Sequence, residues 1–427
     1  MFLSGGGEIS PIVVVGGGPA GMLAAIAARQ ESKRVVLYNK NPWPGKKVAA
    51  IPQDELYFSE KLPPAKMASR FEDKAHFVGP IFRAFNYSDL QKLLKKIGIE
   101  IESDGLGRFR ANGHPAGDIF KTMADSAVKL GVEYIKSARV TDILVSDNQV
   151  EGIKVNGSAK RAAAVILSTG SFSSPKHGAT RDGYNIASRF GHTTNKIRPA
   201  MVDLVTKEKL GKILAGEVLK NIKINILFNG QIIYSEIGDI KFTAAGISGP
   251  AILNHSAEII EKLQSGSVEI ALDLLPEQTK DRIEATLIQL ANIKEQHPAA
   301  DYFNQQFGSK MSLAIRQISH IDLNKSFSRL SNLERKALIL ALKDFHLTVK
   351  DSKPFNSTRG VLGGVSTDFI DPETGQSTIV KGLYFAGAVM DVLGPWGGYN
   401  MQFAFSSGYV AGRAAAMAVE QLYRKPS

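Results

Sequence analysis

The chain has 427 residues, of which 44% are hydrophobic and 22% charged, values typical of a globular protein with two or three domains. It contains no cysteine, which excludes disulfides, thiolate metal sites and a Cys-x-x-Cys electron relay, so a redox function would need a bound cofactor. The formal net charge of +11 would permit nucleic-acid binding, but the Lys and Arg residues are scattered, so we expect no nucleic-acid partner.

Neither a membrane span nor a secretion signal is visible in the sequence. No stretch reaches the about 18 consecutive apolar residues of a membrane helix. The first residues, MFLSGGGEIS, lack the basic-then-apolar pattern of a signal peptide. We therefore expect a cytoplasmic protein without a membrane partner.

The first elements of the chain follow the order strand, helix, strand. Residues 11–15 are an apolar run before three glycines, residues 18–30 are rich in alanine, and residues 34–38 are apolar again. This order predicts two buried parallel strands joined by a right-handed helical crossover. The next segment, residues 41–80, is expected to be irregular because it contains six prolines: Pro42, Pro44, Pro52, Pro63, Pro64 and Pro80.

The remaining elements suggest a nucleotide-binding fold with an insertion. A helix is predicted over residues 116–130, and strands over 132–135, 139–145, 150–155 and 162–167. After Arg198-Pro199 the pattern changes: Asn229-Gly230 predicts a hairpin within 221–235, and helices follow from Pro276 to about residue 347. One of those helices should begin with a capping box at Ser331-Asn332-Leu333-Glu334. A strand at 383–386 and a helix over 399–423 complete the chain.

The glycine turn between the first strand and helix carries the chemistry of a dinucleotide site. Gly16-Gly17-Gly18-Pro19-Ala20-Gly21 contains G-x-G-x-x-G, in which Gly16 permits the tight turn, Gly18 lets a pyrophosphate approach, and Gly21 lets helix pack on strand. The helix N-terminus would offer unpaired N–H groups and partial positive charge to the phosphates. The alternative is a glycine turn that binds no ligand.

The end of the second strand departs from the usual dinucleotide pattern. An acid that binds the ribose hydroxyls is expected about 20 residues after the glycines, and this position holds Asn39. An amide can still accept and donate hydrogen bonds, but it loses the stronger charge-assisted bond. Asn39 could equally be a turn residue at the strand end.

A second glycine-rich stretch lies near the C-terminal end of the chain. Residues 394–404, GPWGGYNMQFA, place paired glycines directly before a predicted helix. Such an N-terminus, aimed at an isoalloxazine ring, would stabilise the negative charge that reduction creates, and Trp396 and Tyr399 could stack on the ring. The alternative is a glycine loop capped by core aromatic residues. We expect no metal site, since His177, His192 and Asp182 lack metal-ligand spacing, and no hydrolase elbow of the G-x-S-x-G kind is present.

At this point the sequence resembles a known family, the BaiN/YhiN-type (aminoacetone-oxidase-like) bacterial FAD-binding flavoproteins. Four segments carry the likeness: residues 13–21, 180–206, 242–253 and 363–412. The resemblance implies an α/β fold, with a Rossmann-like FAD-binding domain interrupted by a β-domain and a helical subdomain. The implied ranges are 1–197 and 355–427 for the FAD domain, 198–275 and 345–354 for the β insert, and 276–344 for the helical subdomain.

The resemblance also implies FAD contacts on particular residues. Gly16, Gly18 and Gly21 would hold the pyrophosphate, Val140 would pair with adenine through its backbone, and Gly170 would pack near the adenosine. Gly398, Asn400 and Met401 would face the flavin. The further expected cofactor contacts are Pro19, Ala20, Asn39, Lys40, Lys47, Thr169, Gly387, Asp391, Gly397 and Tyr399.

Three departures from the family fall on expected cofactor contacts. Asn39 replaces a glutamate, residues 48–54 replace a Gly-Gly-Gly-Arg-Cys-Asn loop, and Ala388 replaces the acid of an Ala-Gly-Glu sequence. Losing two hydrogen-bonding anchors at about 1–2 kcal/mol each would weaken FAD binding roughly thirty- to a thousand-fold. We expect an FAD-dependent oxidoreductase that acts on a small organic substrate, with catalytic residues unassigned. The alternatives are a non-catalytic or altered-nucleotide binding protein with the same fold and, with less support, a flavoprotein acting on RNA.

Overall fold

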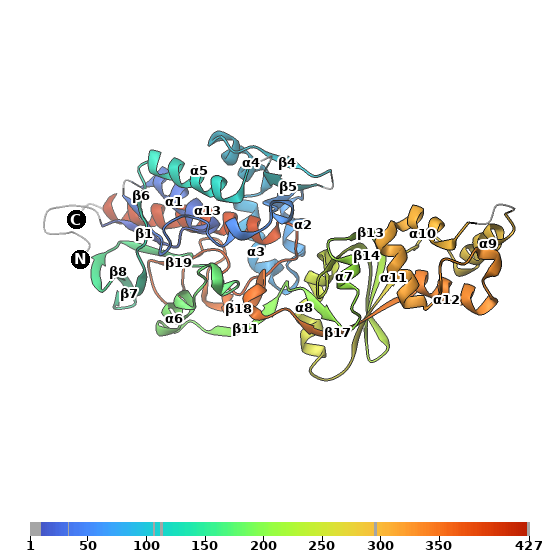
Figure 1. Ribbon diagram of the computed structural model, residues 1–427. Coiled ribbons are helices and arrows are strands. Elements are labelled where there is room, and N and C mark those ends of the chain that lie inside the picture. The colour runs from blue at the N-terminus through green and yellow to red at the C-terminus, as the bar shows by residue number, and fades with distance from the viewer. Residues whose placement is uncertain (1–9, 33, 106, 112–113, 294–296, 425–427) are drawn as a thin grey trace. The chain divides into compact units, whose positions relative to one another are not determined.

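The computed structural model describes residues 10–32, 34–105, 107–111, 114–293 and 297–424 (Figure 1). The chain forms two compact units. The first unit lies within Met1–Pro199 and Arg359–Ser427, so both ends of the chain contribute to it, and the second unit is Ala200–Thr358. Among the described residues, no helix is both long enough and apolar enough to cross a membrane.

A five-stranded parallel sheet forms the centre of the first unit. The strand order is β19-β10-β1-β2-β6, and the bounds are β1 (Ile12–Val15), β2 (Val35–Tyr38), β6 (Glu133–Ile135), β10 (Ala164–Leu167) and β19 (Leu383–Phe385). The apolar runs IVVV, VVLY and AVIL are buried along their whole length, because both faces of the sheet are covered. The predicted strand, helix and strand at the start of the chain are therefore confirmed.

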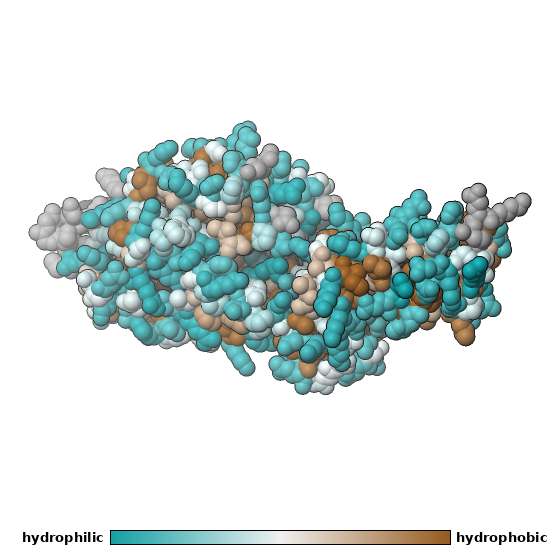
Figure 2. Space-filling model, viewed as in Figure 1, coloured by the Kyte–Doolittle hydropathy of each residue, from teal (hydrophilic) through white to brown (hydrophobic). Residues whose placement is uncertain are grey.

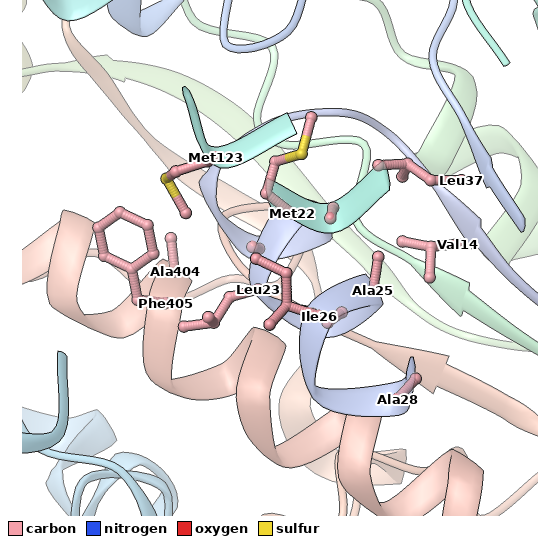
Figure 3. Close-up of a cluster of buried hydrophobic side chains, with 14 of the residues drawn as sticks. Val14, Met22, Leu23, Ala25, Ile26, Ala28, Leu37, Met123, Ala404 and Phe405 are labelled. Carbon is pink, nitrogen blue, oxygen red and sulfur yellow. The ribbon is translucent and has the colours of Figure 1, made fainter. Parts of the chain in front are cut away.

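Helices α1, α5 and α13 cover one face of this sheet. Their bounds are α1 (Pro19–Glu31), α5 (Ala116–Lys129) and α13 (Tyr399–Arg424). In Figure 3, Leu23 and Ile26 of α1 point toward Ala404 and Phe405 of α13. The two helices approach closely because α13 carries glycines at the contact. A Cβ on Gly408 would lie 2.2 Å from the carbonyl oxygen of Ala20, and a Cβ on Gly412 would lie 2.2 Å from that of Ala24.

The opposite face is covered partly by a segment that the sequence led us to expect as irregular. Residues 41–63 do form loops and short 3₁₀ turns apart from the two-residue strand β3 (Ser59–Glu60), but helices α2 (Pro64–Ser69) and α3 (Ala75–Ala84) follow, and α3 continues through Pro80. The expectation was therefore wrong for β3 and for residues 64–69 and 75–80. Proline breaks one hydrogen bond inside α3, but Phe77, Val78, Ile81 and Phe82 are all buried against the sheet side of the core, which offsets the loss.

Smaller elements complete the first unit. They are helices α4 (Tyr87–Lys96) and α6 (Asp182–Arg189), and three small sheets. The sheets contain β3 (Ser59–Glu60), β5 (Arg108–Ala111) and β4 (Ile101–Ser103); β7 (Val140–Ser146), β8 (Gln149–Val155) and β9 (Ser158–Arg161); and β11 (Thr194–Ala200) with β18 (Gly360–Val365).

The second unit contains a closed six-stranded barrel followed by helices. The barrel order is β12-β15-β14-β13-β16-β17, with β12 (Leu204–Thr206), β13 (Val218–Phe228), β14 (Gln231–Thr243), β15 (Gly246–Ser248), β16 (Val268–Asp273) and β17 (Phe345–Ser352). Asn229-Gly230 joins β13 to β14 as predicted, with Phe228 paired to Gln231. Helices α7 (Gly211–Leu214) and α8 (Pro250–Lys262) accompany the barrel.

Four helices interrupt the barrel between β16 and β17. They are α9 (Lys280–Ala291), α10 (Ala299–Phe307), α11 (Ser309–Ser319) and α12 (Asn332–Lys343). The predicted capping box is confirmed, because Ser331 and Glu334 exchange both of its hydrogen bonds at the start of α12. In Figure 2, hydrophobic residues gather over the part of this unit that holds β13 and β14, where Val218, Ile232 and Ile237 are exposed.

Candidate nucleotide-binding site

The glycine turn after β1 has no room for side chains at two of its three motif positions. Gly16 has φ +114°, and a Cβ there would lie 2.5 Å from the carbonyl oxygen of Ser168 at the end of β10. A Cβ on Gly21 would lie 1.8 Å from the carbonyl oxygen of Gly16. These glycines therefore let β1, β10 and α1 pack closely, which is the role the motif predicts.

Gly18 differs from the other two glycines because it faces open space. A Cβ built on it would meet no atom within 4 Å. Gly18 is also the N-cap of α1, where no side chain caps the helix, and Pro19 occupies the first helical position. An uncapped helix start beside an open glycine fits the pyrophosphate of a dinucleotide. Pro19 has no N–H to donate, and Ala20 is buried against Gly387 and α13, so their contribution to such a site is the shape of the backbone.

Asn39 lies at the end of β2, as expected, but its amide is used inside the protein. Its Nδ2 donates to the carbonyl oxygen of Trp43 at 3.0 Å and to the Tyr134 hydroxyl at 2.9 Å, and the residue is 4% exposed. Its Oδ1 accepts the backbone N–H of Asn41 at 3.5 Å. Asn39 therefore holds the turn after β2 against β6 and leaves no amide donor for a ribose.

Lys40, the next residue, belongs to a network of charged side chains. Its Nζ donates to the Thr180 hydroxyl at 2.7 Å, and Asp182 lies close enough to act on its charge. Asp182 is held by Arg139 through two hydrogen bonds of 2.9 and 2.7 Å. Burial lowers the pKa of Lys40; the charge of Asp182 opposes this shift only in part, and the charge of Arg139 adds to it. Burial acts to raise the pKa of Asp182, but the bonds from Arg139 and Thr180 outweigh it and lower that pKa.

Lys47 places a second ammonium group at the carboxyl end of the sheet. Its Nζ donates to the Ser171 carbonyl oxygen at 2.8 Å, to the Ser171 hydroxyl at 3.3 Å and to the Ser173 hydroxyl at 3.2 Å. All three acceptors are neutral. Although the residue as a whole is half-buried, its ammonium is enclosed, and burial together with the charge of Lys40 lowers the pKa of Lys47 to about 8.

Two of the residues expected to contact adenosine lie beside these lysines. A Cβ on Gly170 would be 3.6 Å from the Lys47 ammonium nitrogen. Val140 begins β7 directly after Arg139, and the Ala138 N–H bonds to the Asn39 carbonyl oxygen at 3.0 Å, which ties this strand to the end of β2. We refer to Asn39, Lys40, Val140 and Gly170 as the adenosine subsite. Thr169 turns its hydroxyl toward α6, next to Gly183, so that only its backbone faces this region.

The expected residues after β19 are held by contacts within the protein. Gly387 has its N–H bonded to the Ser407 hydroxyl at 2.9 Å, and a Cβ on it would lie 2.7 Å from the Cβ of Ala20. The carboxylate of Asp391 accepts the Gly363 N–H and the Asn195 side-chain N–H, each at 2.8 Å. Asp391 therefore fixes β18 and the turn after β19 in one arrangement.

The second glycine turn leads directly into α13. Gly397 and Gly398 have φ of +120° and +106°, and a Cβ on Gly398 would lie 2.8 Å from the Ser59 nitrogen. Asn400 bonds through its amide to the N–H and the carbonyl oxygen of Gly394, at 2.8 Å each. Met401 is half-buried against the core that α1 also lines. Because α1 packs on α13, both glycine turns lie in one unit, although they are far apart in the sequence.

Sequence reasoning missed a group of side chains around this second turn. The buried Tyr399 hydroxyl donates a close hydrogen bond to Glu60 of β3, and burial and Glu60 raise the pKa of Tyr399. The Arg108 guanidinium lies 4.6 Å from the centre of the Tyr57 ring and 5.5 Å from that of Trp396, and it pairs with Asp104 at 2.7 Å. The aromatic residues that follow the altered loop could have indicated this group. Their partners could not be identified from the sequence, because they are distant along the chain.

The altered loop itself packs against the protein. Val48 is buried, and both Val48 and Ile51 pack against the core between the sheet and α5. Glu55 forms an ion pair with Arg359 at 3.2 Å. The side chain of Asp54 is outside the described residues. The loop that lines the flavin in the resembled family is thus replaced here by two short turns, Val48–Ala50 and Gln53–Glu55.

His192 and Asp182, which lie near one another in the sequence, bind different partners in the structure. His192 is buried, with Nε2 at 2.8 Å from the Ser377 hydroxyl, and burial lowers the pKa of His192 to about 4. Asp182 is bound to Arg139 as described above. Among the described residues, no group of three or more His, Asp or Glu side chains could hold a metal ion.

The chain is similar to known proteins along nearly its whole length. A family model described as HI0933-like protein Rossmann domain matches residues 10–414. A 3-dehydro-bile acid delta(4,6)-reductase of Clostridium scindens is 28% identical over 95% of this chain and 98% of that protein. A ribosomal RNA dihydrouridine synthase of Escherichia coli is 26% identical over 93% of this chain and 96% of that protein.

Solved structures share the fold at lower sequence identity. A flavocytochrome c3 fumarate reductase has a TM-score of 0.52 at 17% identity, covering 96% of this chain and 78% of that one. A 3-ketosteroid-delta4-(5alpha)-dehydrogenase of Rhodococcus jostii has a TM-score of 0.51 at 15% identity, covering 95% and 96%. Together the matches confirm the expected α/β Rossmann-like fold, FAD as the cofactor and an oxidoreductase class. The chain belongs to the HI0933-like family of Rossmann-fold flavoproteins.

Proposed function

We propose that this protein is an FAD-dependent reductase that saturates a carbon–carbon double bond conjugated to a carbonyl group in a small organic molecule. The names of two relatives support this chemistry. A 3-dehydro bile acid with delta(4,6) unsaturation has double bonds conjugated to a ketone, and dihydrouridine is uridine whose ring double bond next to a carbonyl has been reduced. When bound, FAD supplies the electron pair for such a reduction.

The observation that carries the proposal is the pair of glycine-bounded helix starts in one unit. The open Gly18 at the N-terminus of α1 suits the pyrophosphate, and Gly397-Gly398 at the N-terminus of α13 suits the flavin end of the same cofactor. The N-terminus of α13 would stabilise negative charge on a reduced ring. The protein's own contribution is to bind the cofactor at both ends and to keep the reacting carbonyl compound oriented.

Reduction of a conjugated double bond also requires a proton at the carbon next to the carbonyl group. Tyr399 and Glu60 are the candidate source, because they lie beside the Gly397-Gly398 turn and share a hydrogen bond. The raised pKa of Tyr399 keeps its hydroxyl protonated near neutral pH. After transfer, water would supply the replacement proton, and the Glu60 carboxylate could relay it to the tyrosinate. Tyr399 is thus our proposed proton donor, a role for which the sequence alone suggested no residue.

Anaerobic reoxidation of the flavin tests the proposal. The protein is loaded with FAD, reduced with dithionite and mixed with a 3-oxo steroid that has a double bond at position 4, and the saturated 3-oxo steroid serves as the matched control. We expect the absorbance of oxidised flavin to return only with the unsaturated ketone. Absence of flavin absorbance after FAD is added, or equal behaviour with both ketones, would contradict it. Tyr399→Phe should slow reoxidation and leave FAD affinity unchanged.

A second candidate is the same reduction on uridine in RNA. The observation that favours it is the charge distribution: residues 200–358 contain 19 Lys and Arg against 18 Asp and Glu, so the excess of basic residues lies in the first unit, with 33 against 23. Dihydrouridine formation in unmodified ribosomal RNA, measured by mass spectrometry, separates the two candidates. RNA binding through this charge should weaken steeply as salt is raised.

A further inference from the structure

The adenosine subsite differs from an ordinary FAD subsite in the sign of its charge. An acid at the end of the second strand binds the ribose hydroxyls and repels a phosphate group on that ribose. Here that position holds Asn39, which is neutral and donates both amide hydrogens to Trp43 and Tyr134. The feature that would exclude a ribose phosphate is therefore missing.

Positive charge is present in its place. Lys40 follows Asn39 directly, and Lys47 lies beside Gly170. The ammonium of Lys40 bonds to a neutral hydroxyl, that of Thr180, and the ammonium of Lys47 bonds only to neutral oxygens of Ser171 and Ser173 in the described contacts. Asp182, whose carboxylate acts on the charge of Lys40, is bound by Arg139 through both of its oxygens and by the Thr180 hydroxyl.

The balance of these four side chains favours an anion. Lys40, Lys47 and Arg139 carry three positive charges against the single negative charge of Asp182. The pyrophosphate of a dinucleotide would bind at the open Gly18 and the start of α1. It therefore does not explain why a positive charge stands at Lys40. Lys40 lies instead at the end of β2, next to the position that contacts the ribose.

We propose that the adenosine subsite recognises a phosphate monoester on the adenosine ribose, with Lys40 as its main contact, and binds such a nucleotide in preference to one with a bare ribose. A basic residue near this strand end is how Rossmann folds accommodate a ribose 2′-phosphate. FAD and a ribose-phosphorylated adenine nucleotide then compete for one pocket. The inference goes beyond the proposed reductase activity and does not depend on it.

Binding of three small nucleotides to the full-length protein tests the inference. The probes are AMP, adenosine 2′,5′-bisphosphate and adenosine 3′,5′-bisphosphate, each titrated into the FAD-free protein by calorimetry and into the FAD complex by competition. We expect one bisphosphate to bind at least about tenfold more tightly than AMP, which corresponds to about 1.4 kcal/mol. The 2′ and 3′ isomers show which kind of phosphorylated ribose the subsite prefers.

Variants identify the residue responsible. Lys40→Gln keeps a polar side chain but removes the positive charge, so it should remove the preference and leave AMP binding within about twofold. Lys40→Arg retains the charge and should keep the preference. Lys66→Gln is the matched control, because Lys66 is an exposed lysine of α2. Equal binding of all three nucleotides, no binding of any, or a preference that survives Lys40→Gln would overturn the inference. Reoxidation of reduced FAD by the unsaturated ketone in the same preparations would show that the proposed function stands even if this inference falls.

Discussion

Replacing Gly18 by alanine tests the nucleotide site without disturbing the fold. A Cβ at this position meets no atom within 4 Å, and Gly18 has φ −89°, which alanine adopts without strain. The folded state should therefore accept Gly18→Ala. Because alanine restricts the unfolded chain more than glycine does, the free energy of unfolding should rise by about 0.4–1 kcal/mol.

The same methyl group should strongly weaken FAD binding. It enters the open space in front of α1 that lets a pyrophosphate approach the backbone N–H groups. Loss of one charge-assisted hydrogen bond costs about 1.5–3 kcal/mol, which corresponds to roughly a ten- to 150-fold loss of affinity. The variant should be slightly more stable than the wild type and yet bind FAD poorly.

Urea unfolding of the FAD-free protein and FAD titration by flavin fluorescence measure the two effects separately. Gly21→Ala should lose both stability and FAD binding, because its Cβ would lie 1.8 Å from the Gly16 carbonyl oxygen. Gly79→Ala in α3 is the matched control, since its nearest neighbour is the flexible end of Arg83 at 3.5 Å, and it should retain both properties. Wild-type FAD affinity in Gly18→Ala would refute the assignment of this turn to the pyrophosphate.

Three further predictions concern buried charged groups. Since burial lowers the pKa of Lys47 from 10.5 to about 8, the stability of the FAD-free protein should rise between those pH values, and this rise should be absent in Lys47→Met. Urea unfolding at pH 7 and pH 10 checks this, and equal pH dependence in both proteins would contradict it. The lowered pKa of His192, about 4 against 6.5, predicts that stability falls as pH decreases through that range; the fall should be smaller in His192→Gln when thermal unfolding is followed against pH. In the second unit, Lys343→Met should destabilise the fold by about 3–5 kcal/mol in urea unfolding, because it leaves Asp273, 2.6 Å from the Lys343 ammonium, as an unpaired buried charge, whereas the exposed control Lys336→Met should change little.

The features that could be predicted from the sequence are those with local causes. The G-x-G-x-x-G turn, the Asn229-Gly230 hairpin and the capping box at Ser331 each depend on residues within a few positions of one another. The helix through Pro80 could not be predicted in this way. Its stability comes from burying Phe77 and Phe82 against residues elsewhere in the chain, and this outweighs a local signal against helix.

In the candidate site too, the sequence predicts where residues lie along the chain but not which distant residues they contact. The positions of Gly18, Asn39 and Gly398 follow from spacing in the sequence. What Asn39 contacts does not, because its partner Tyr134 lies 95 residues away, and Lys47 reaches Ser171 across 124 residues. The charge at the adenosine subsite can therefore be recognised only when the fold brings together the residues after β2 and β10 and those at the start of β7.

The close packing of α1 on α13 has a consequence for how the protein is made. Gly408 and Gly412 meet the backbone of Ala20 and Ala24, so α1 cannot complete its packing until α13 has been translated, after the whole second unit. Residues 200–358 make their contacts mainly among themselves and can complete their barrel while the earlier segment is still unpaired. A nascent chain should then expose the apolar side of α1 until α13 has been made, which favours chaperone binding and delays cofactor loading until both helices are present.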